Sequence, residues 1–239
     1  LQNISRPINM FEELKSQFIL NFITDDRWLS LLKGLVVTLE ITFFAVILGF
    51  LLGFSVAVVR NIYDNTKKLK FLNFLCNIYL TVIRGTPVVV QLLIIYFVIF
   101  SSVRIDKSFA AILAFGINSG AYQAEIFRSG INSVPKGQME AGRSLGFSYP
   151  QTMINIIMPQ AIKNVLPTLA NEFIVLMKET SVAGYIALED LTKAGDVIRS
   201  RTYSAMMPFL AVALLYLIMV MLFSYLVKLL ERRLARSGR

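Results

Sequence analysis

The chain has 239 residues, of which 56% are apolar and 16% are charged, with 24 Lys and Arg against 15 Asp and Glu. Soluble domains average ~45–50% apolar residues, so this composition predicts a polytopic membrane protein with one membrane domain. A single cysteine, Cys76, excludes an intrachain disulfide and a Cys₄ metal site. The absence of histidine excludes His metal ligands and Ser-His-Asp triads, and no metal site is expected.

The two ends of the chain differ in composition from its middle. Residues 1–30 mix polar and apolar residues, and residues 232–239 are basic. We expect an extracellular or interfacial segment over 1–30, a transmembrane domain over 31–231 and a basic cytoplasmic tail over 232–239. Within the first segment, the pattern from Phe11 to Phe22 predicts an amphipathic helix at the membrane surface.

Five apolar stretches along the chain are close to or longer than the ~20 residues that cross a bilayer. They are Leu35–Val59, Pro87–Val103, Phe109–Phe127, Ala161–Met177 and Ala205–Leu230. Pro159 and Pro167 are expected to interrupt the fourth. Basic residues after the first stretch, between the third and fourth, and in the tail place those segments in the cytoplasm. The predicted fold is an all-α membrane protein with five transmembrane helices, the N-terminus outside and the C-terminus cytoplasmic.

Two G-x-x-x-G patterns lie within the predicted spans. Gly49 and Gly53 belong to the first span, and Gly116 and Gly120 belong to the third. Small residues at this spacing let two helices approach closely. Glycine is also common in membrane helices without such a role, so both interpretations stay open.

Polar residues within the spans are candidates for a substrate pathway, because they cannot face lipid cheaply. The candidates are Glu40, Asn118, Ser119, Tyr122, Gln123, Asn171 and Glu172. The same residues could instead make hydrogen bonds between helices. Each carboxylate could also be neutralised by protonation or by a neighbouring Lys or Arg.

The segment over residues 136–159 predicts two helices joined by a sharp turn. Lys136 to Leu145 can be helical, and Gly146 follows where a helix favours a left-handed residue. Ser148 and Gln151 form a capping box, with a proline in the first turn that follows. Such a segment can be an ordinary cytoplasmic loop or an element that docks on a partner, and the remaining alternative is a DNA-binding helix–turn–helix. The flanking membrane spans argue against it, so no nucleic-acid partner is expected.

This segment resembles the EAA loop of bacterial ABC importer permeases, whose pattern is E-A-A, three residues, G, nine residues, I-x-L-P. The matching positions, with Arg143 between them, are Glu140, Ala141, Gly142, Gly146, Ile156 and Pro159. Gly142 replaces an alanine of the pattern, and Met158 replaces a leucine. The resemblance implies a loop that couples the membrane domain to an ATPase. Glu140 is expected to pair with Arg143 or with a cation on that ATPase.

Two further segments resemble the polar amino-acid branch of these permeases. The first is R-G-T-P-x-x-V-Q, with Arg84, Gly85, Thr86, Pro87 and Gln91. The second is A-Y-x-A-E-x-x-R, with Glu125 and Arg128. Together the resemblances cover roughly residues 30 to 230.

The resemblance implies a type I ABC importer permease fold in a bacterial plasma membrane. It implies uptake of a polar amino acid, either cationic (arginine, lysine or histidine) or glutamine or glutamate. The implied partners are a dimeric cytoplasmic ABC ATPase, a second identical or different permease subunit, and an extracellular or periplasmic binding protein. ATP and Mg²⁺ would bind to the ATPase, so this chain is expected to be no enzyme and to hold no cofactor.

Two other classes of protein remain as alternatives. An ion-coupled secondary transporter or a channel would also place carboxylates in polar helices, and ATP dependence of uptake would separate it from an importer. An intramembrane enzyme is the third class, but no catalytic set assembles from these residues. If Glu40 and Glu172 faced a shared cavity, they would favour a cationic amino acid.

Overall fold

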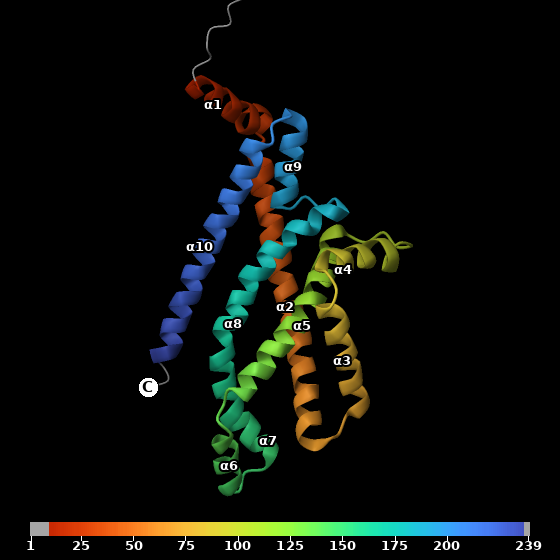
Figure 1. The fold of residues 1–239 in the computed structure, drawn as a ribbon, viewed down its shortest axis with the longest axis vertical. Coiled ribbons are helices and arrows are strands. Elements are labelled where there is room, and N and C mark those ends of the chain that lie inside the picture. The colour runs from red at the N-terminus through yellow and green to blue at the C-terminus, as the bar shows by residue number, and fades with distance from the viewer. Residues whose placement is uncertain (1–9, 237–239) are drawn as a thin grey trace, which may run out of the picture.

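The computed structural model of the chain describes residues 10–236, with side chains described as far as residue 234, and every regular element in that part is a helix (Figure 1). The elements are α1 (Met10–Phe18), η1 (Ile19–Ile23), η2 (Thr24–Asp26), α2 (Trp28–Thr66), α3 (Lys70–Arg84), α4 (Val88–Ile94), η3 (Ile95–Ile99), α5 (Lys107–Asn132), α6 (Lys136–Ser144), α7 (Tyr149–Thr152), η4 (Met153–Ile157), α8 (Met158–Glu179), η5 (Thr180–Ile186), α9 (Leu191–Thr202) and α10 (Met206–Arg236). Parts of the predicted N-terminal segment and of the basic tail, residues 1–9 and 237–239, lie outside the described residues.

Within the described residues, two helices, α2 and α10, are long and apolar enough to cross a membrane unaided. A third crossing would be the bent pair of α3 with α4 and η3, whose two arms meet at 108°. The predicted second span over Pro87–Val103 falls on the second arm of this pair and stays a prediction. Its helices end at Ile99, and their seven and five residues fall short of the ~20 that a span needs. Helices α5 and α8 are long enough but too polar by the same measure, so five spans stay a prediction.

Helices α2 and α5 cross in close contact along the middle of the molecule (Figure 1). A Cβ added at Gly53 would lie 2.8 Å from the carbonyl oxygen of Gly120, and one at Gly49 would lie 2.7 Å from Nε2 of Gln123. A Cβ at Gly116 would lie 2.6 Å from the side chain of Leu48. The two G-x-x-x-G patterns therefore face each other, and the packing interpretation is confirmed.

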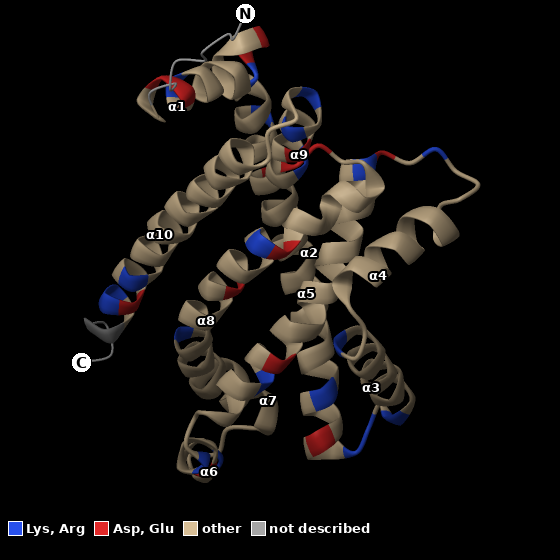
Figure 2. Cartoon of the chain, turned by 45° about the horizontal axis from the view of Figure 1, so that its top comes forward, with Lys and Arg blue, Asp and Glu red and all other residues tan. Residues whose placement is uncertain are grey.

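The fourth predicted span is not interrupted. Pro159 lies in the first turn of α8, where a missing N–H costs little, and Pro167 lies inside a helix that continues to Glu179. The expectation of a break at either proline was wrong. Figure 2 shows α8 as a bowed helix, in line with the curvature that an internal proline introduces.

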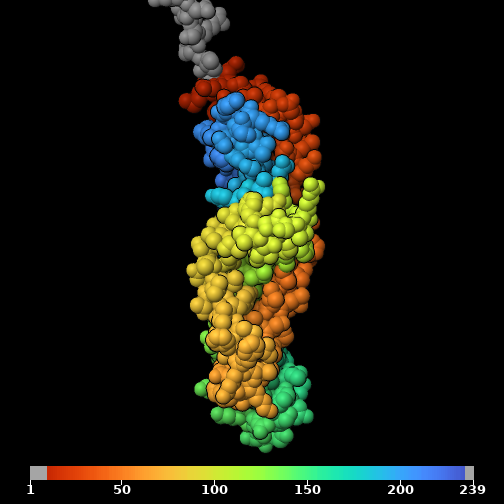
Figure 3. All heavy atoms as spheres, turned by 90° about the vertical axis from the view of Figure 1, so that its right-hand side faces the viewer, coloured from red at the N-terminus to blue at the C-terminus, as the bar shows by residue number. Residues whose placement is uncertain are grey.

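The connections gather at two opposite ends of the molecule. At one end lie α1 and α9 (Figure 1). The loop before α5 lies farther toward the middle, and there Nζ of Lys107 donates to the carbonyl oxygen of Ala187 at 3.0 Å. The predicted helix over Phe11 to Phe22 is present as α1 and η1, and Thr202 of α9 holds it by a 2.8 Å hydrogen bond to Asn21. At the other end α6 and α7 project beyond α3, as the space-filling view in Figure 3 shows.

Candidate functional site

The turn between α6 and α7 has the left-handed glycine that the sequence predicts. Gly146 has φ = +90°. Its N–H donates to the carbonyl oxygen of Arg143 at 3.1 Å, and the N–H of Phe147 donates to the carbonyl oxygen of Gly142 at 3.2 Å. This pair of bonds is a Schellman motif, which satisfies the last carbonyls of α6 and reverses the chain.

Helix α7 begins with the predicted capping box. The N–H of Ser148 donates to Oε1 of Gln151 at 2.8 Å, and the N–H of Gln151 donates to Oγ of Ser148 at 3.4 Å. Pro150 lies in the first turn, as expected. The hydroxyl of Tyr149 donates to Oδ1 of Asn61 on α2 at 3.0 Å, and burial raises the pKa of Tyr149. The loop is therefore a locally closed unit fastened to the end of α2.

Most of the predicted coupling-loop residues lie on the surface. Glu140, Ala141, Arg143, Gly146 and Pro159 are exposed, Ile156 is half-buried and Gly142 is buried. The expected pairing of Glu140 with Arg143 is wrong. Arg143 donates to the carbonyl oxygen of Phe147 at 3.0 Å, and Glu140 makes no salt bridge within residues 10–236.

Gly142, which departs from the E-A-A pattern, lies where α6 packs on the following helix. A Cβ at this position would lie 2.5 Å from Cγ2 of Thr152 and 2.9 Å from Cδ1 of Ile156. Since both neighbours are side chains of the packed helix, an alanine here would push α6 away from it. Close packing thus accounts for the substitution.

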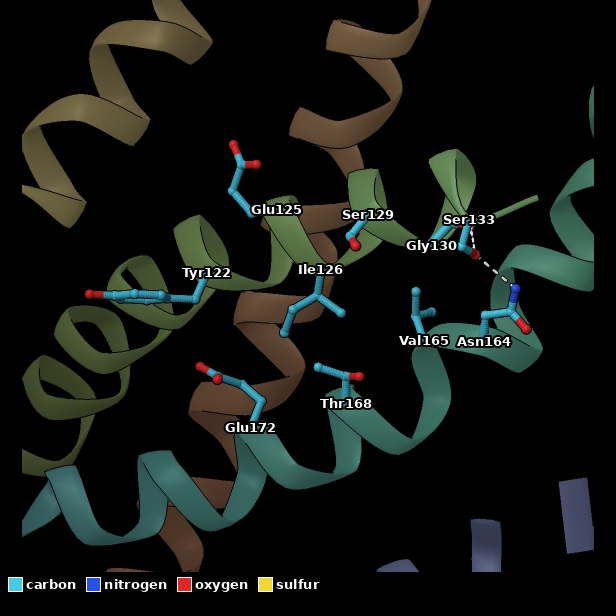
Figure 4. Close-up of a pocket in the computed structure, with 10 residues that line it drawn as sticks. All are labelled: Tyr122, Glu125, Ile126, Ser129, Gly130, Ser133, Asn164, Val165, Thr168 and Glu172. Atoms are coloured by element: carbon cyan, nitrogen blue, oxygen red, sulfur yellow. Dashed lines mark hydrogen bonds between the residues drawn. The ribbon is translucent and has the colours of Figure 1, made fainter. Parts of the chain in front are cut away.

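A cavity of about 390 Å³ lies between α5 and α8 (Figure 4). Its lining residues are Tyr122, Glu125, Ile126, Ser129, Gly130, Ser133, Asn164, Val165, Thr168 and Glu172. Glu172 reaches from α8 toward α5, and one of its oxygens accepts a 3.1 Å hydrogen bond from Oγ of Ser119. Within residues 10–236 it has no salt bridge to Lys or Arg. A carboxylate with no positive partner faces this cavity.

The predicted pathway residues divide between this cavity, the interior and the surface. Tyr122 and Glu172 line the cavity, and Ser119 contacts Glu172 directly. Gln123 is buried behind them and donates to Ser119 at 3.0 Å. Asn118 is buried as well, and its Nδ2 donates to Gln91 rather than facing the cavity.

Two of the predicted pathway residues lie elsewhere. Glu40 and Asn171 are exposed and do not line the cavity with Glu172. Glu40 and Glu172 therefore do not share this cavity, so the pair gives no reason to favour a cationic amino acid. Helix periodicity alone could not reveal this, because it does not say which face of α2 or α8 the cavity occupies.

The R-G-T-P-x-x-V-Q segment forms the bend between α3 and α4. Nε2 of Gln91 donates to the carbonyl oxygen of Ile83 at 2.8 Å and to Oγ1 of Thr86 at 2.9 Å. Its Oε1 accepts from Nδ2 of Asn118 on α5 at 3.0 Å. Pro87 has the extended conformation that precedes α4. Gln91 therefore satisfies backbone groups freed by the bend and ties the bend to α5.

Three arginines from three helices surround Glu125. The carboxylate lies 2.8 Å from Nη1 of Arg60 on α2, 3.2 Å from Nε of Arg128 on α5 and 3.8 Å from Nη1 of Arg84 on α3. The guanidinium of Arg84 also lies over the ring of Tyr122, 5.7 Å from its centre. The structure thus joins the two amino-acid-branch segments. Sequence reasoning missed Arg60, because the predicted span ends at Val59 whereas α2 continues to Thr66.

Comparison with known proteins identifies the family of this chain. Residues 45–236 match the model of a family described as the binding-protein-dependent transport system inner membrane component. The chain belongs to this family of ABC importer permeases. It is a multi-pass component of the bacterial inner membrane, and ATP hydrolysis belongs to a separate subunit. The alternatives of an ion-coupled transporter, a channel or an intramembrane enzyme are thereby set aside.

Named relatives cover most of this permease. It is 37% identical over 208 residues to a putative glutamine transport system permease protein of Rickettsia typhi, covering 86% of this chain and 93% of the relative. It is 34% identical to the arginine transport system permease protein of Bacillus subtilis, covering 85% and 92%. A crystal structure of an amino acid ABC transporter with histidines matches with a TM-score of 0.81 at 41% identity, covering 89% and 98%.

Proposed function

We propose that this permease takes up a polar amino acid, and that the substrate passes along the cavity between α5 and α8. The R-G-T-P and A-Y-x-A-E-x-x-R segments support this class of substrate, as do relatives named for glutamine, arginine and L-cystine transport. The relatives differ among themselves in substrate, so their names favour no single amino acid.

The observation that carries the proposal is the environment of Glu172. Its carboxylate faces the cavity between α5 and α8, accepts one hydrogen bond from Ser119, and has no salt-bridge partner among the described residues. A carboxylate in the membrane domain needs a compensating positive charge or N–H donors. An amino acid supplies these through its ammonium group or a side chain that ends in nitrogen.

The proposed assembly follows the two ends of the molecule. The exposed end formed by α6 and α7 docks on a cytoplasmic ATPase dimer, which binds ATP and Mg²⁺, and this chain itself binds no cofactor. The opposite end, with α9, and the loop before α5 face an external binding protein. Five crossings with the N-terminus outside give this orientation. A second permease chain completes the membrane domain, since a single thin bundle leaves the polar faces of α5 and α8 incompletely covered.

The test is a substrate panel on the assembled complex in lipid vesicles. We expect glutamine, arginine, lysine, histidine, glutamate or cystine, singly or as a small group, to stimulate ATP hydrolysis and ATP-dependent uptake. Glu172→Gln should lower the apparent affinity at least tenfold while the complex still assembles. Glu231→Gln is the matched control, because the same change falls on an exposed residue near the end of α10.

Three outcomes would contradict the proposal. Stimulation by none of the six amino acids would reject the substrate class. Uptake that does not require ATP would reject the mechanism. Equal effects of the Glu172 and Glu231 variants would remove Glu172 from the pathway.

A further inference from the structure

We propose that Arg84 and Arg128 form the site for the carboxylate of the substrate, at the rim of the cavity beside Glu125. The substrate then lies along α5 with its carboxylate on the arginines and the nitrogen-bearing end of its side chain on Glu172. This inference rests on the proposed function and adds the orientation of the substrate to it.

The first argument is the imbalance of charge around Glu125. Three guanidinium groups share one carboxylate, which leaves an excess of positive charge. Arg60 makes the shortest contact and its side chain is 20% exposed, whereas Arg84 and Arg128 are 45% and 44% exposed. Arg84 is the most loosely held, at 3.8 Å. Guanidinium groups bind carboxylates through paired N–H donors, so the two exposed arginines are suited to a second carboxylate.

The second argument is the position of these arginines relative to the cavity. Arg84 contacts the ring of Tyr122 and the carboxylate of Glu125, and both of those residues line the cavity. Figure 4 shows Tyr122 and Glu125 on α5 and Glu172 across from them on α8, with the carboxylate of Glu125 directed away from α8. The positive charge therefore lies at one edge of the cavity and the unpaired carboxylate of Glu172 at another.

The third argument is the spacing along α5. Ser119, which donates to Glu172, and Glu125, which holds the arginines, are six residues apart. At a rise of 1.5 Å and 3.6 residues per turn, the two positions are about 9 Å apart along the helix axis and lie on different faces of α5. The ammonium and carboxylate on one Cα are separated by only two bond lengths of about 1.5 Å each, so they cannot bridge it. A long side chain ending in N–H donors, as in arginine, lysine or glutamine, can.

The experiment measures binding to the purified permease–ATPase complex in lipid nanodiscs by calorimetry. The binding protein is left out, because its own specificity would hide that of the permease. Each amino acid is compared with the same molecule lacking its carboxylate: L-arginine with agmatine, L-lysine with cadaverine, and L-glutamine with 4-aminobutanamide. For the amino acid that binds most tightly, we expect at least tenfold weaker binding of its decarboxylated partner.

The decisive variant is Arg84→Gln. We expect it to weaken binding of the amino acid about tenfold and to leave the decarboxylated compound within twofold, so that the preference for the carboxylate is lost. Arg84→Lys should restore part of the preference, because it keeps the charge without the paired donors. Arg104→Gln, an exposed change in the loop before α5, is the control and should alter neither affinity.

The other outcomes overturn the inference. Equal weakening of both compounds by Arg84→Gln would mean that Arg84 only supports packing, and no change in either would mean that it does not meet the carboxylate. If Arg84→Gln fails to assemble, Arg128→Gln tests the same site by the same ratio. Binding of the decarboxylated compound as tight as that of the amino acid in the unmodified complex would reject a carboxylate site but leave amino-acid uptake standing. Binding of none of the amino acids would reject the proposed function as well.

Discussion

Replacing Gly146 by alanine tests whether the turn between α6 and α7 transmits motion to the membrane helices. A Cβ at this position meets no atom within 4 Å, so the substitution is not opposed by crowding. The penalty is conformational, because φ at this glycine is +90°, and an L-residue in the left-handed region costs about 1–2 kcal/mol. That free energy corresponds to a factor of about 5–30 in the population of the native turn. Gly146→Val should be worse, since its β-branched side chain is more restricted.

Gly137→Ala is the matched control for this change. Gly137 lies in α6 of the same loop, a Cβ there also meets nothing within 4 Å, and its φ is not in the left-handed region. Alanine favours a helix over glycine by up to about 1 kcal/mol, so this variant should be neutral or slightly stabilising. The same change from glycine to alanine is thus expected to destabilise the loop at position 146 and to leave it unchanged or slightly more stable at position 137.

The assay is co-purification of the ATPase with the permease and substrate-stimulated ATP hydrolysis in vesicles. We expect Gly146→Ala to insert normally, because no membrane helix changes, but to hold the ATPase several-fold more weakly and to hydrolyse ATP with less uptake. Gly137→Ala should behave as the unmodified complex does. Normal docking and coupling with alanine or valine at position 146 would refute the view that this turn is the lever.

Further changes test the packing and the orientation. Gly53→Ala should destabilise the α2–α5 contact by about 1–3 kcal/mol, because its Cβ would lie 2.8 Å from a backbone oxygen of α5. We expect a lower melting temperature in detergent, and an unchanged one would contradict the close packing. Gln91→Leu leaves backbone carbonyls at the α3–α4 bend without their donor and should cost about 1–3 kcal/mol by the same measurement. In a Cys76→Ser background, cysteine at Ser102 should react with an impermeant thiol reagent from outside and cysteine at Ser148 only from inside. The reverse pattern would overturn the orientation.

The structure of the loop over residues 136–159 could be predicted from the sequence, because contacts between neighbours in the chain form it. Gly146 and the Ser148–Gln151 capping box make all their defining hydrogen bonds within a few residues, so local propensity suffices. The contact between the two G-x-x-x-G patterns was predictable as a possibility for a similar reason. The residue types at that spacing remove the side chains that would keep two helices apart.

The rest of the site depended on contacts between residues far apart in the chain. Glu125 and Arg60 are separated by 65 positions, and no local pattern says that α2 turns this arginine toward α5. The exposure of Glu40 and the role of Gln91 at a bend of 108° likewise follow from which helix faces meet. Periodicity defines the faces of a helix but not their partners. The sequence by itself therefore determined the class of protein and the shape of the loop over residues 136–159. The tertiary structure decided which charges surround the cavity, because only the packing of α2, α3, α5 and α8 brings those side chains together.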